Sequence, residues 1–197
     1  MAPRIRQSPV VSRQSPVTKL RGAETRLLKD RIQPGARVLF VGINPGLRSA
    51  ATGHHFAGYS NRFWKLLYES GLVPEPITYE DDDRLPQWGF GITNIVPRAT
   101  AGIDELKPED YRAGALLLLK KIRRYKPKVV ALVGVTVWRA LLEALGEKNL
   151  RKQPVTLGFQ ELTIEGARVA VLPNPSGRNA TLTYAEMVKA FRTLISC

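Results

Sequence analysis

The stretch that decides the fold is Arg37-Val38-Leu39-Phe40-Val41-Gly42-Ile43-Asn44-Pro45-Gly46. It begins as a run of β-branched and other apolar residues, which is typical of a strand buried on both faces. It ends on glycine and proline, which suit a tight loop because glycine permits positive φ and proline fixes φ. A buried strand therefore leads into a short polar loop that carries the amide of Asn44. In open α/β sheets, ligands bind at this end of the strands.

Strands and helices alternate along the rest of the chain. We expect strands over 90–95, 129–134 and 169–172, a small antiparallel excursion over 155–165, and helices over 24–32, 61–70, 109–125, 136–145 and from Thr183 onward. Ser60 is expected to cap the second helix, and Thr183 with Glu186 has the spacing of a capping box. Residues 44–59 and 73–88 are expected to form loops, the second with one helical turn. The alternation predicts an α/β fold, with a parallel sheet covered by helices on both faces.

Three of the predicted loops carry unusual polar residues. They follow the first, second and last core strands, and they contain Asn44, Asn94 and the segment 174–179. Because the carboxyl ends of parallel strands lie at the same edge of a sheet, we expect these loops to surround one cleft.

Composition restricts the class of protein. The 197 residues suit one domain with a tail, and 30 Lys and Arg against 17 Asp and Glu give a net charge of +13. This excess favours nucleic acid as a partner, and the alternative is a generally basic protein. One cysteine and two adjacent histidines provide neither a disulfide framework nor a zinc site. We expect no membrane span and no secretory signal, and a location in a bacterial cytosol.

The N-terminal segment differs from the rest. Residues 1–23 carry five basic residues and no acidic one, and Arg6–Val10 recurs as Arg13–Val17. Such a proline- and serine-containing segment predicts a disordered arm, which either follows DNA phosphates or is an inert extension. Residues 24–197 are then expected to form a single domain.

The polar residues of the predicted cleft limit its chemistry. The sequence has no phosphate-binding loop, no dinucleotide fingerprint and no nucleophile elbow. Its acids cluster in 80–83 and 104–110, where we expect them to be solvated. A site of amides, a hydroxyl, glycines and aromatics can orient a water and bond to a heterocycle, but it offers no strong base.

Three motifs resemble those of a known family. They are Gly42-Ile43-Asn44-Pro45-Gly46-Leu47, then Thr52-Gly53-His54-His55-Phe56-Ala57 continuing to Asn61-Arg62-Phe63-Trp64-Lys65, and finally Asn174-Pro175-Ser176-Gly177. Together they resemble the mismatch-specific uracil/thymine DNA glycosylases, family 2 of the uracil-DNA glycosylase superfamily, in order and separation over roughly residues 36–195.

The resemblance implies a fold and an activity. The fold is a three-layer α/β/α sandwich around a short, mainly parallel central sheet. The activity is hydrolysis of the N-glycosidic bond of a flipped base, without a metal, a cofactor or a lysine nucleophile. Asn44 takes the catalytic position, where its side-chain oxygen holds the attacking water. The alternative for Asn44 is a turn-forming residue that bonds to its own backbone.

The resemblance also assigns residues that bind the base. Phe56 is expected to stack on the extruded uracil, although a lone phenylalanine is more commonly a core residue. Backbone N–H groups near Ile43 and Gly46 are expected to face uracil oxygens, and Ser49 to lie near the C5 side of the base.

Asn94 departs from the family pattern, in which lysine is usual at this position. An amide there resembles the wider superfamily, whose members donate to uracil O4 and accept from N3–H. We expect Asn94 to recognise uracil, and the alternative is an asparagine at the end of a strand on the surface.

The last motif is expected to contact the DNA. Arg178 occupies the position of the side chain that fills the space left by the flipped base, with Ser176 and Gly177 before it. Asn174 is expected on the O2 side of the base and Asn179 at the opposite strand. The alternative for this segment is a solvated turn.

The remaining residues of the motifs have simpler expected roles. Arg48 and Arg62 are expected to contact phosphates. His54 and His55 depart from the family, and we expect a plain loop role for both, without catalysis.

These features predict a monomeric, monofunctional DNA glycosylase of base excision repair. Its partner is double-stranded DNA with a mismatched or damaged base, and it removes uracil, opposite guanine, to leave an abasic site. Thymine in G·T pairs and modified pyrimidines are further candidate substrates. The alternatives are a DNA-lesion binder without catalysis and a hydrolase of free nucleosides.

Overall fold

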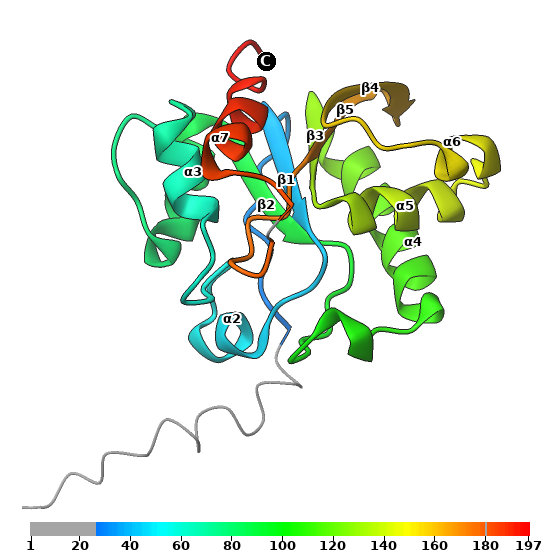
Figure 1. Ribbon diagram of the computed structural model, residues 1–197, viewed down its shortest axis with the longest axis horizontal. Coiled ribbons are helices and arrows are strands. Elements are labelled where there is room, and N and C mark those ends of the chain that lie inside the picture. The colour runs from blue at the N-terminus through cyan, green and yellow to red at the C-terminus, as the bar shows by residue number, and fades with distance from the viewer. Residues whose placement is uncertain (1–26, 180) are drawn as a thin grey trace, which may run out of the picture.

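A five-stranded sheet lies between two layers of helices in the computed structural model, which describes residues 27–179 and 181–197 (Figure 1). The strands are β1 (Val38–Gly42), β2 (Phe90–Asn94), β3 (Val129–Val133), β4 (Gly158–Ile164) and β5 (Ala167–Leu172). Their order is β2-β1-β3-β5-β4, and only the pairing of β4 with β5 is antiparallel. The predicted α/β fold with a short, mainly parallel sheet is confirmed.

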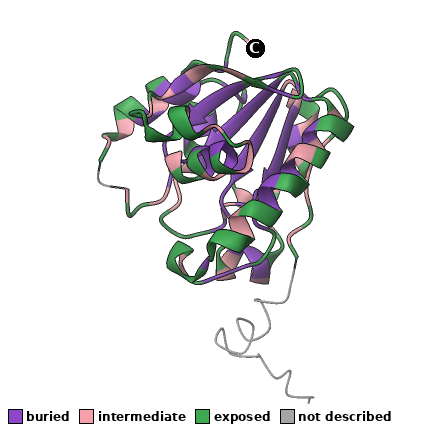
Figure 2. Ribbon diagram, turned by 90° about the vertical axis from the view of Figure 1, so that its right-hand side faces the viewer, coloured by how far each residue is buried: buried purple, intermediate pink, exposed green. Residues whose placement is uncertain are grey.

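The sheet is buried because its strands are apolar on both faces. All five residues of β1 are buried, and its four apolar side chains alternate between two apolar clusters. Val38 and Phe40 pack into the first cluster, whereas Leu39 and Val41 pack into the second. Figure 2 shows the strands buried and the outer surfaces of the helices exposed. A continuous apolar run is what a strand covered on both faces requires.

Helices cover each face of the sheet. The α-helices are α2 (Leu47–Thr52), α3 (Phe63–Glu69), α4 (Pro108–Tyr125), α5 (Val135–Ala144), α6 (Lys148–Lys152) and α7 (Tyr184–Arg192), and the 3₁₀ helices are η2 (Tyr79–Trp88) and η3 (Ile103–Glu105). The first apolar cluster includes residues of α3, η2 and α7, and the second includes residues of α4 and α5. In Figure 1 these groups lie on opposite sides of the sheet.

The ends of two helices follow the sequence signals closely. Thr183 Oγ1 accepts from the backbone N–H of Glu186, and the Glu186 carboxylate accepts from the backbone N–H of Thr183, so the predicted capping box begins α7. Helix α4 has Glu109 and Asp110 in its first turn and basic residues in its last, as the helix dipole favours.

The prediction of a helix over 24–32 is wrong for the described residues 27–32. Arg31 instead pairs with Ile92 of β2, with backbone N–H···O distances of 3.0 and 2.8 Å in the two directions. The open edge of β2 supplies hydrogen bonds that an isolated short helix cannot match. Residues 24–26 and the predicted basic arm over 1–23 lie outside the described residues.

The other corrections concern short elements. Helix α2 lies within the predicted loop 44–59, η2 extends over ten residues where one helical turn was expected, and α6 was not predicted. Ser60 does not cap α3. Asn61 Oδ1 instead accepts from the backbone N–H of Phe63 at 2.9 Å.

The strand register places the polar loops side by side. Gly42 at the end of β1 is in register with Asn94 at the end of β2, and β5 pairs in parallel with β3, which in turn pairs with β1. The segments that follow these strands therefore leave the sheet at the same edge. None of the helices in the described part of the chain is long and apolar enough to cross a membrane.

Candidate active site

A cleft of about 850 Å³ opens at the carboxyl edge of the sheet. It is lined by the segments that follow β1, β2, β3 and β5, as expected for a parallel sheet. The predicted site residues that line it are Ile43, Asn44, Gly46, Ser49, Phe56, Asn94, Asn174, Ser176, Arg178 and Asn179. Arg48, Arg62 and Gly177 are not among the lining residues.

The side chain of Asn44 is held through its nitrogen. Asn44 Nδ2 donates to Thr100 Oγ1 at 2.7 Å, to the Arg98 carbonyl at 3.1 Å and to the Pro45 carbonyl at 3.2 Å. Thr100 Oγ1 in turn donates its hydrogen to the Gly102 carbonyl at 2.7 Å. A hydroxyl has one hydrogen, so Thr100 Oγ1 can only accept from Asn44. These hydrogen bonds fix the amide nitrogen of Asn44 beside Thr100 and leave Asn44 Oδ1 as an acceptor.

Phe56 has a strained backbone and a stacked ring. Its φ of 50° is in the left-handed region, which costs on the order of 1 kcal/mol for a residue with a side chain. Its ring stacks on the buried ring of Phe63, with centroids 4.1 Å apart and an interplanar angle of 18°. One face of Phe56 is therefore covered by the core, while the ring also lines the cleft.

Two small residues keep Phe56 in place. A Cβ atom on Gly42 would lie 2.6 Å from Asn94 Oδ1 and 3.1 Å from Phe56 Cζ, so any larger residue there would displace both. Ser49 is buried, and its Oγ accepts from the backbone N–H of Ala57 at 3.0 Å. Ser49 therefore holds the loop that carries Phe56, in addition to lining the cleft.

Asn94 ends β2 beside Gly42 and is only 9% exposed. Its Nδ2 lies 3.4 Å from His55 Nδ1, and its Oδ1 lies against Gly42. The Asn94 amide and the Phe56 ring thus meet in one corner of the cleft.

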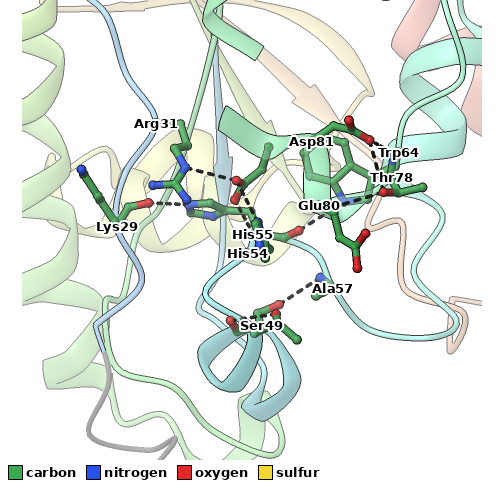
Figure 3. A network of polar contacts seen from close by, with 12 residues as sticks. Lys29, Arg31, Ser49, His54, His55, Ala57, Trp64, Thr78, Glu80 and Asp81 are labelled. Carbon is green, nitrogen blue, oxygen red and sulfur yellow. Dashed lines mark hydrogen bonds and ion pairs between the residues drawn. The ribbon is translucent and has the colours of Figure 1, made fainter. Parts of the chain in front are cut away.

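His55 lies behind Asn94 and is buried, 1% exposed. Its Nε2 lies 3.1 Å from the Lys29 carbonyl (Figure 3). Its backbone N–H donates to Asp82 Oδ2 at 2.9 Å, and its carbonyl accepts from Trp64 Nε1 at 3.1 Å. Burial lowers the pKa of His55 below its ordinary value, against smaller contributions in the opposite direction from the Lys29 carbonyl and Asp82.

The 174–179 loop is shaped by its own asparagines. Asn174 lines the cleft, and its Oδ1 accepts from the backbone N–H of Ser176 at 3.0 Å, so the amide nitrogen is the end of this side chain that can still donate. Asn179 uses both ends of its amide, since its Nδ2 donates to the Asn174 carbonyl and its Oδ1 accepts from the Thr181 N–H. Arg178 is exposed at the rim of the cleft.

The same loop is fastened to the start of α3. Arg62 donates to the carbonyls of Ser176 at 2.9 Å and Asn179 at 3.2 Å. A Cβ atom on Gly177 would lie 2.5 Å from Ser60 Cβ, so this close approach requires glycine. Two motifs that are more than one hundred residues apart in sequence therefore form one structural unit.

Arg48 is held by residues that do not line the cleft. It donates to the Ala57 carbonyl at 2.6 Å and to Tyr79 at 3.2 Å, and its guanidinium lies 3.8 Å from the centre of the Tyr59 ring. Its predicted contact with phosphate, like that of Arg62, stays a prediction.

Several lining residues were missed from sequence. They include Leu28, the loop Thr100–Asp104, the segment Val133–Thr136 and the pair Val155 and Leu157. The loop at 100–104 follows β2 and the segment at 133–136 follows β3, so the position of strand ends could have indicated both. No sequence signal indicated Leu28, which lies well before the first strand.

The cleft contains little acid or base. Asp104 is the one carboxylate among the described residues that line it, and it is exposed. Fixed amides, an aromatic face and backbone groups can position a water molecule and bind a flat polar ring, but a pair of catalytic carboxylates is missing from this lining set.

Comparison with known protein families agrees with this geometry. Residues 29–195 match the family model described as the uracil DNA glycosylase superfamily. The match includes every strand of the sheet and every loop at the carboxyl edge.

Proposed function

Because the chain belongs to the uracil DNA glycosylase superfamily, we propose that it is a monofunctional glycosylase that removes uracil from DNA and leaves an abasic site. The observation that carries the proposal is the orientation of Asn44. The Thr100 hydroxyl and two backbone carbonyls take up its nitrogen, and its oxygen is left as an acceptor in the cleft. An acceptor held there can bind the water that attacks C1′ of the flipped nucleotide.

The chemistry follows from what an amide cannot do. Asn44 has no useful pKa, so it cannot take a proton from water as a strong base. The C1′–N1 bond therefore breaks largely before water adds, and uracil leaves with the electron pair as an anion. The oxygen of the held water then bonds to the oxocarbenium-like C1′, and its excess proton passes to solvent. Catalysis depends on positioning and on stabilisation of the departing anion.

Uracil is recognised in the corner of the cleft where the Phe56 ring and the Asn94 amide meet. The base stacks on the face of Phe56 opposite to Phe63, and its N3–H and O4 meet the amide of Asn94. Cytosine has the reverse order of donor and acceptor at these two positions, so an amide of fixed orientation rejects it. Asn174 donates to O2 from the other side.

Binding to duplex DNA involves the rim of the cleft. Arg178 enters the duplex in place of the flipped base, where its planar guanidinium can stack and bond to the unpaired guanine. The charge of +13 supplies a salt-dependent attraction to phosphates. We further propose a preference for uracil opposite guanine, action on some G·T or modified pyrimidine pairs, a monomeric protein, and a cytosolic location.

One assay tests the proposal against its rivals. An oligonucleotide with a single uracil is incubated with the protein as a single strand and as a duplex opposite guanine, then treated with alkali, in parallel with free deoxyuridine. Strand cleavage at the uracil without release of base from deoxyuridine supports a DNA glycosylase. Binding without cleavage would indicate a lesion binder, and release from deoxyuridine would indicate a nucleoside hydrolase.

A further inference from the structure

We infer that His55 is a positioning residue that sets the direction of the Asn94 amide and thereby determines which base the cleft accepts. This inference deepens the proposed function and rests on it. It concerns a residue that family resemblance leaves without a role and that sequence reasoning placed in a plain loop.

The direction of the amide follows from the hydrogen bonds of the imidazole. The Lys29 carbonyl can only accept, so His55 Nε2, 3.1 Å away, carries a hydrogen. In a neutral imidazole the other nitrogen, Nδ1, then has only a lone pair. Asn94 must therefore direct Nδ2 toward His55 Nδ1, at 3.4 Å, and keep Oδ1 on the side of Gly42.

The backbone of His55 is held on both sides, and its ring is buried. Its backbone N–H donates to Asp82 and its carbonyl accepts from the indole of Trp64. Asp82 is itself fully buried, and its other oxygen lies 3.1 Å from both Arg31 Nε and His54 Nδ1. With 1% of its surface exposed, His55 has no room in solvent, and a turn of its ring away from Asn94 would also break its contact with the Lys29 carbonyl.

The imidazole is neutral at neutral pH. Burial lowers the pKa of His55, and the charged groups that face it are Asp82, Asp30 and Arg31, with His54 next to it in the chain. Opposite charges in this set act against each other, which leaves burial as the largest influence. Protonation of His55 in acid would place hydrogens on both nitrogens and turn the amide of Asn94 around.

The consequence concerns the choice between uracil and cytosine. One hydrogen of Asn94 Nδ2 is directed to His55, and the second remains for O4 of the base, while Oδ1 remains to accept from N3–H. A reversed amide would present a donor where N3–H of uracil needs an acceptor. His55 touches no substrate atom in this arrangement, so it acts only through Asn94.

The first test uses the wild-type protein. The chain has two histidines, so nitrogen-15 NMR of labelled histidine gives one pair of ring signals for each residue, and His54→Gln assigns them. We expect His55 to be the Nε2–H tautomer at neutral pH. An Nδ1–H tautomer or an imidazolium would overturn the inference, because either form would require the opposite amide direction.

The second test is a double-mutant cycle on uracil excision. His55→Gln keeps a donor near the Lys29 carbonyl but moves its acceptor oxygen away from the Nδ1 position, whereas His55→Asn keeps an acceptor near the Nδ1 position. We expect His55→Gln to lower kcat/KM for uracil about tenfold or more, with His55→Asn affected less. In the Asn94→Ala background, His55→Gln should change kcat/KM by less than about twofold, since the residue through which it acts is gone.

The outcomes separate this inference from the proposed function. A wild-type protein that leaves uracil in place overturns the proposed function, and this inference with it. An active wild type in which His55→Gln has the same effect with and without Asn94 would show a structural role only and overturn this inference alone. His54→Gln should change kcat/KM far less than His55→Gln. If His55→Gln does not fold, the tautomer measured in the wild type decides.

Discussion

Two asparagines at neighbouring strand ends, Asn44 after β1 and Asn94 at the end of β2, are held by matching chains of hydrogen bonds. Each amide nitrogen donates to one side chain, Thr100 Oγ1 or His55 Nδ1, and that side chain donates to a backbone carbonyl, of Gly102 or Lys29. Each series of hydrogen bonds ends on a backbone carbonyl, which can only accept. The carbonyl therefore fixes the donor and the acceptor in both hydrogen bonds of its series.

The two series of hydrogen bonds differ in their middle group, which is the hydroxyl of Thr100 in one and the imidazole of His55 in the other. A threonine hydroxyl does not titrate in water, whereas an imidazole changes charge near neutral pH. The amide assigned to chemistry is therefore held in a way that is independent of pH, and the amide assigned to base recognition is held by a group that acid can reverse. With these assignments, one cleft keeps a constant catalytic geometry beside a recognition geometry that depends on pH.

The largest effect should come from Asn44→Ala. Removing the acceptor that positions water should lower the single-turnover rate of uracil excision by about 10³-fold, the size seen when one preorganised polar group is lost from an active site. Affinity for a duplex with an abasic site should stay within about twofold, because Asn44 acts on the reaction and not on the phosphates. Equal rates in variant and wild type would remove Asn44 from the mechanism.

Asn94→Ala should have the next largest effect. Loss of one bidentate contact to the base should lower uracil excision by about 10- to 100-fold, with general DNA binding nearly unchanged. Rates and gel-shift affinities measured on the same duplex give both values. If binding falls as much as excision, Asn94 does not recognise the base.

Thr100→Val tests the chain that holds Asn44. Valine has the shape of threonine without the oxygen, so the Asn44 amide loses its shortest hydrogen bond and is held only by the carbonyls of Arg98 and Pro45. We expect the excision rate to fall by about tenfold, in line with the loss of one hydrogen bond. Thr100→Ser is the matched control, since it keeps the hydroxyl and should retain most of the activity. If Thr100→Val and Thr100→Ser excise uracil at the same rate, the Thr100 hydroxyl does not hold the Asn44 amide in place.

Arg178→Ala changes a residue that belongs to neither series of hydrogen bonds. Arg178 is exposed, so its removal should leave the melting temperature unchanged. Affinity for the abasic product should fall by about tenfold, because a stacking contact in the duplex is lost. Unchanged product affinity in a fluorescence anisotropy titration would argue against its entry into the duplex.

The smallest effect is on stability in acid. The pKa of His55 is lowered by folding, so the unfolded chain binds more protons than the folded one below the ordinary pKa of histidine. Stability from this residue is complete above that ordinary value and is lost as the pH falls toward the lowered one. The melting temperature should therefore drop by a few degrees more in wild type than in His55→Asn when the pH falls from about 7 to about 5. Parallel curves for the two proteins would show that His55 does not contribute.

The parts of the fold that follow from sequence depend on local patterns. The apolar run of β1, the capping box at Thr183 and the charges at the ends of α4 each act within a few residues. The cleft could also be predicted, because parallel strands bring their following loops to one edge whatever their separation in sequence.

The parts that could not be predicted depend on distant partners. Arg31 lies outside any helix because the edge of β2 pairs with it, 61 residues later in the chain. His55 is buried by contacts to Lys29 and Asp82, which are 26 and 27 residues away. Thr100 meets Asn44 across 56 residues. Nothing in the neighbouring sequence of these residues indicates such contacts.

A crystal structure of Asn44→Ala bound to a duplex with one G·U pair, in which the substrate stays intact, would show directly how the cleft holds the base. We expect uracil to lie in the cleft, with its ring on Phe56 and its N3–O4 edge against Asn94, whose nitrogen remains beside His55 Nδ1. A uracil that stays stacked in the duplex, or that turns a different edge toward Asn94, would contradict this expectation.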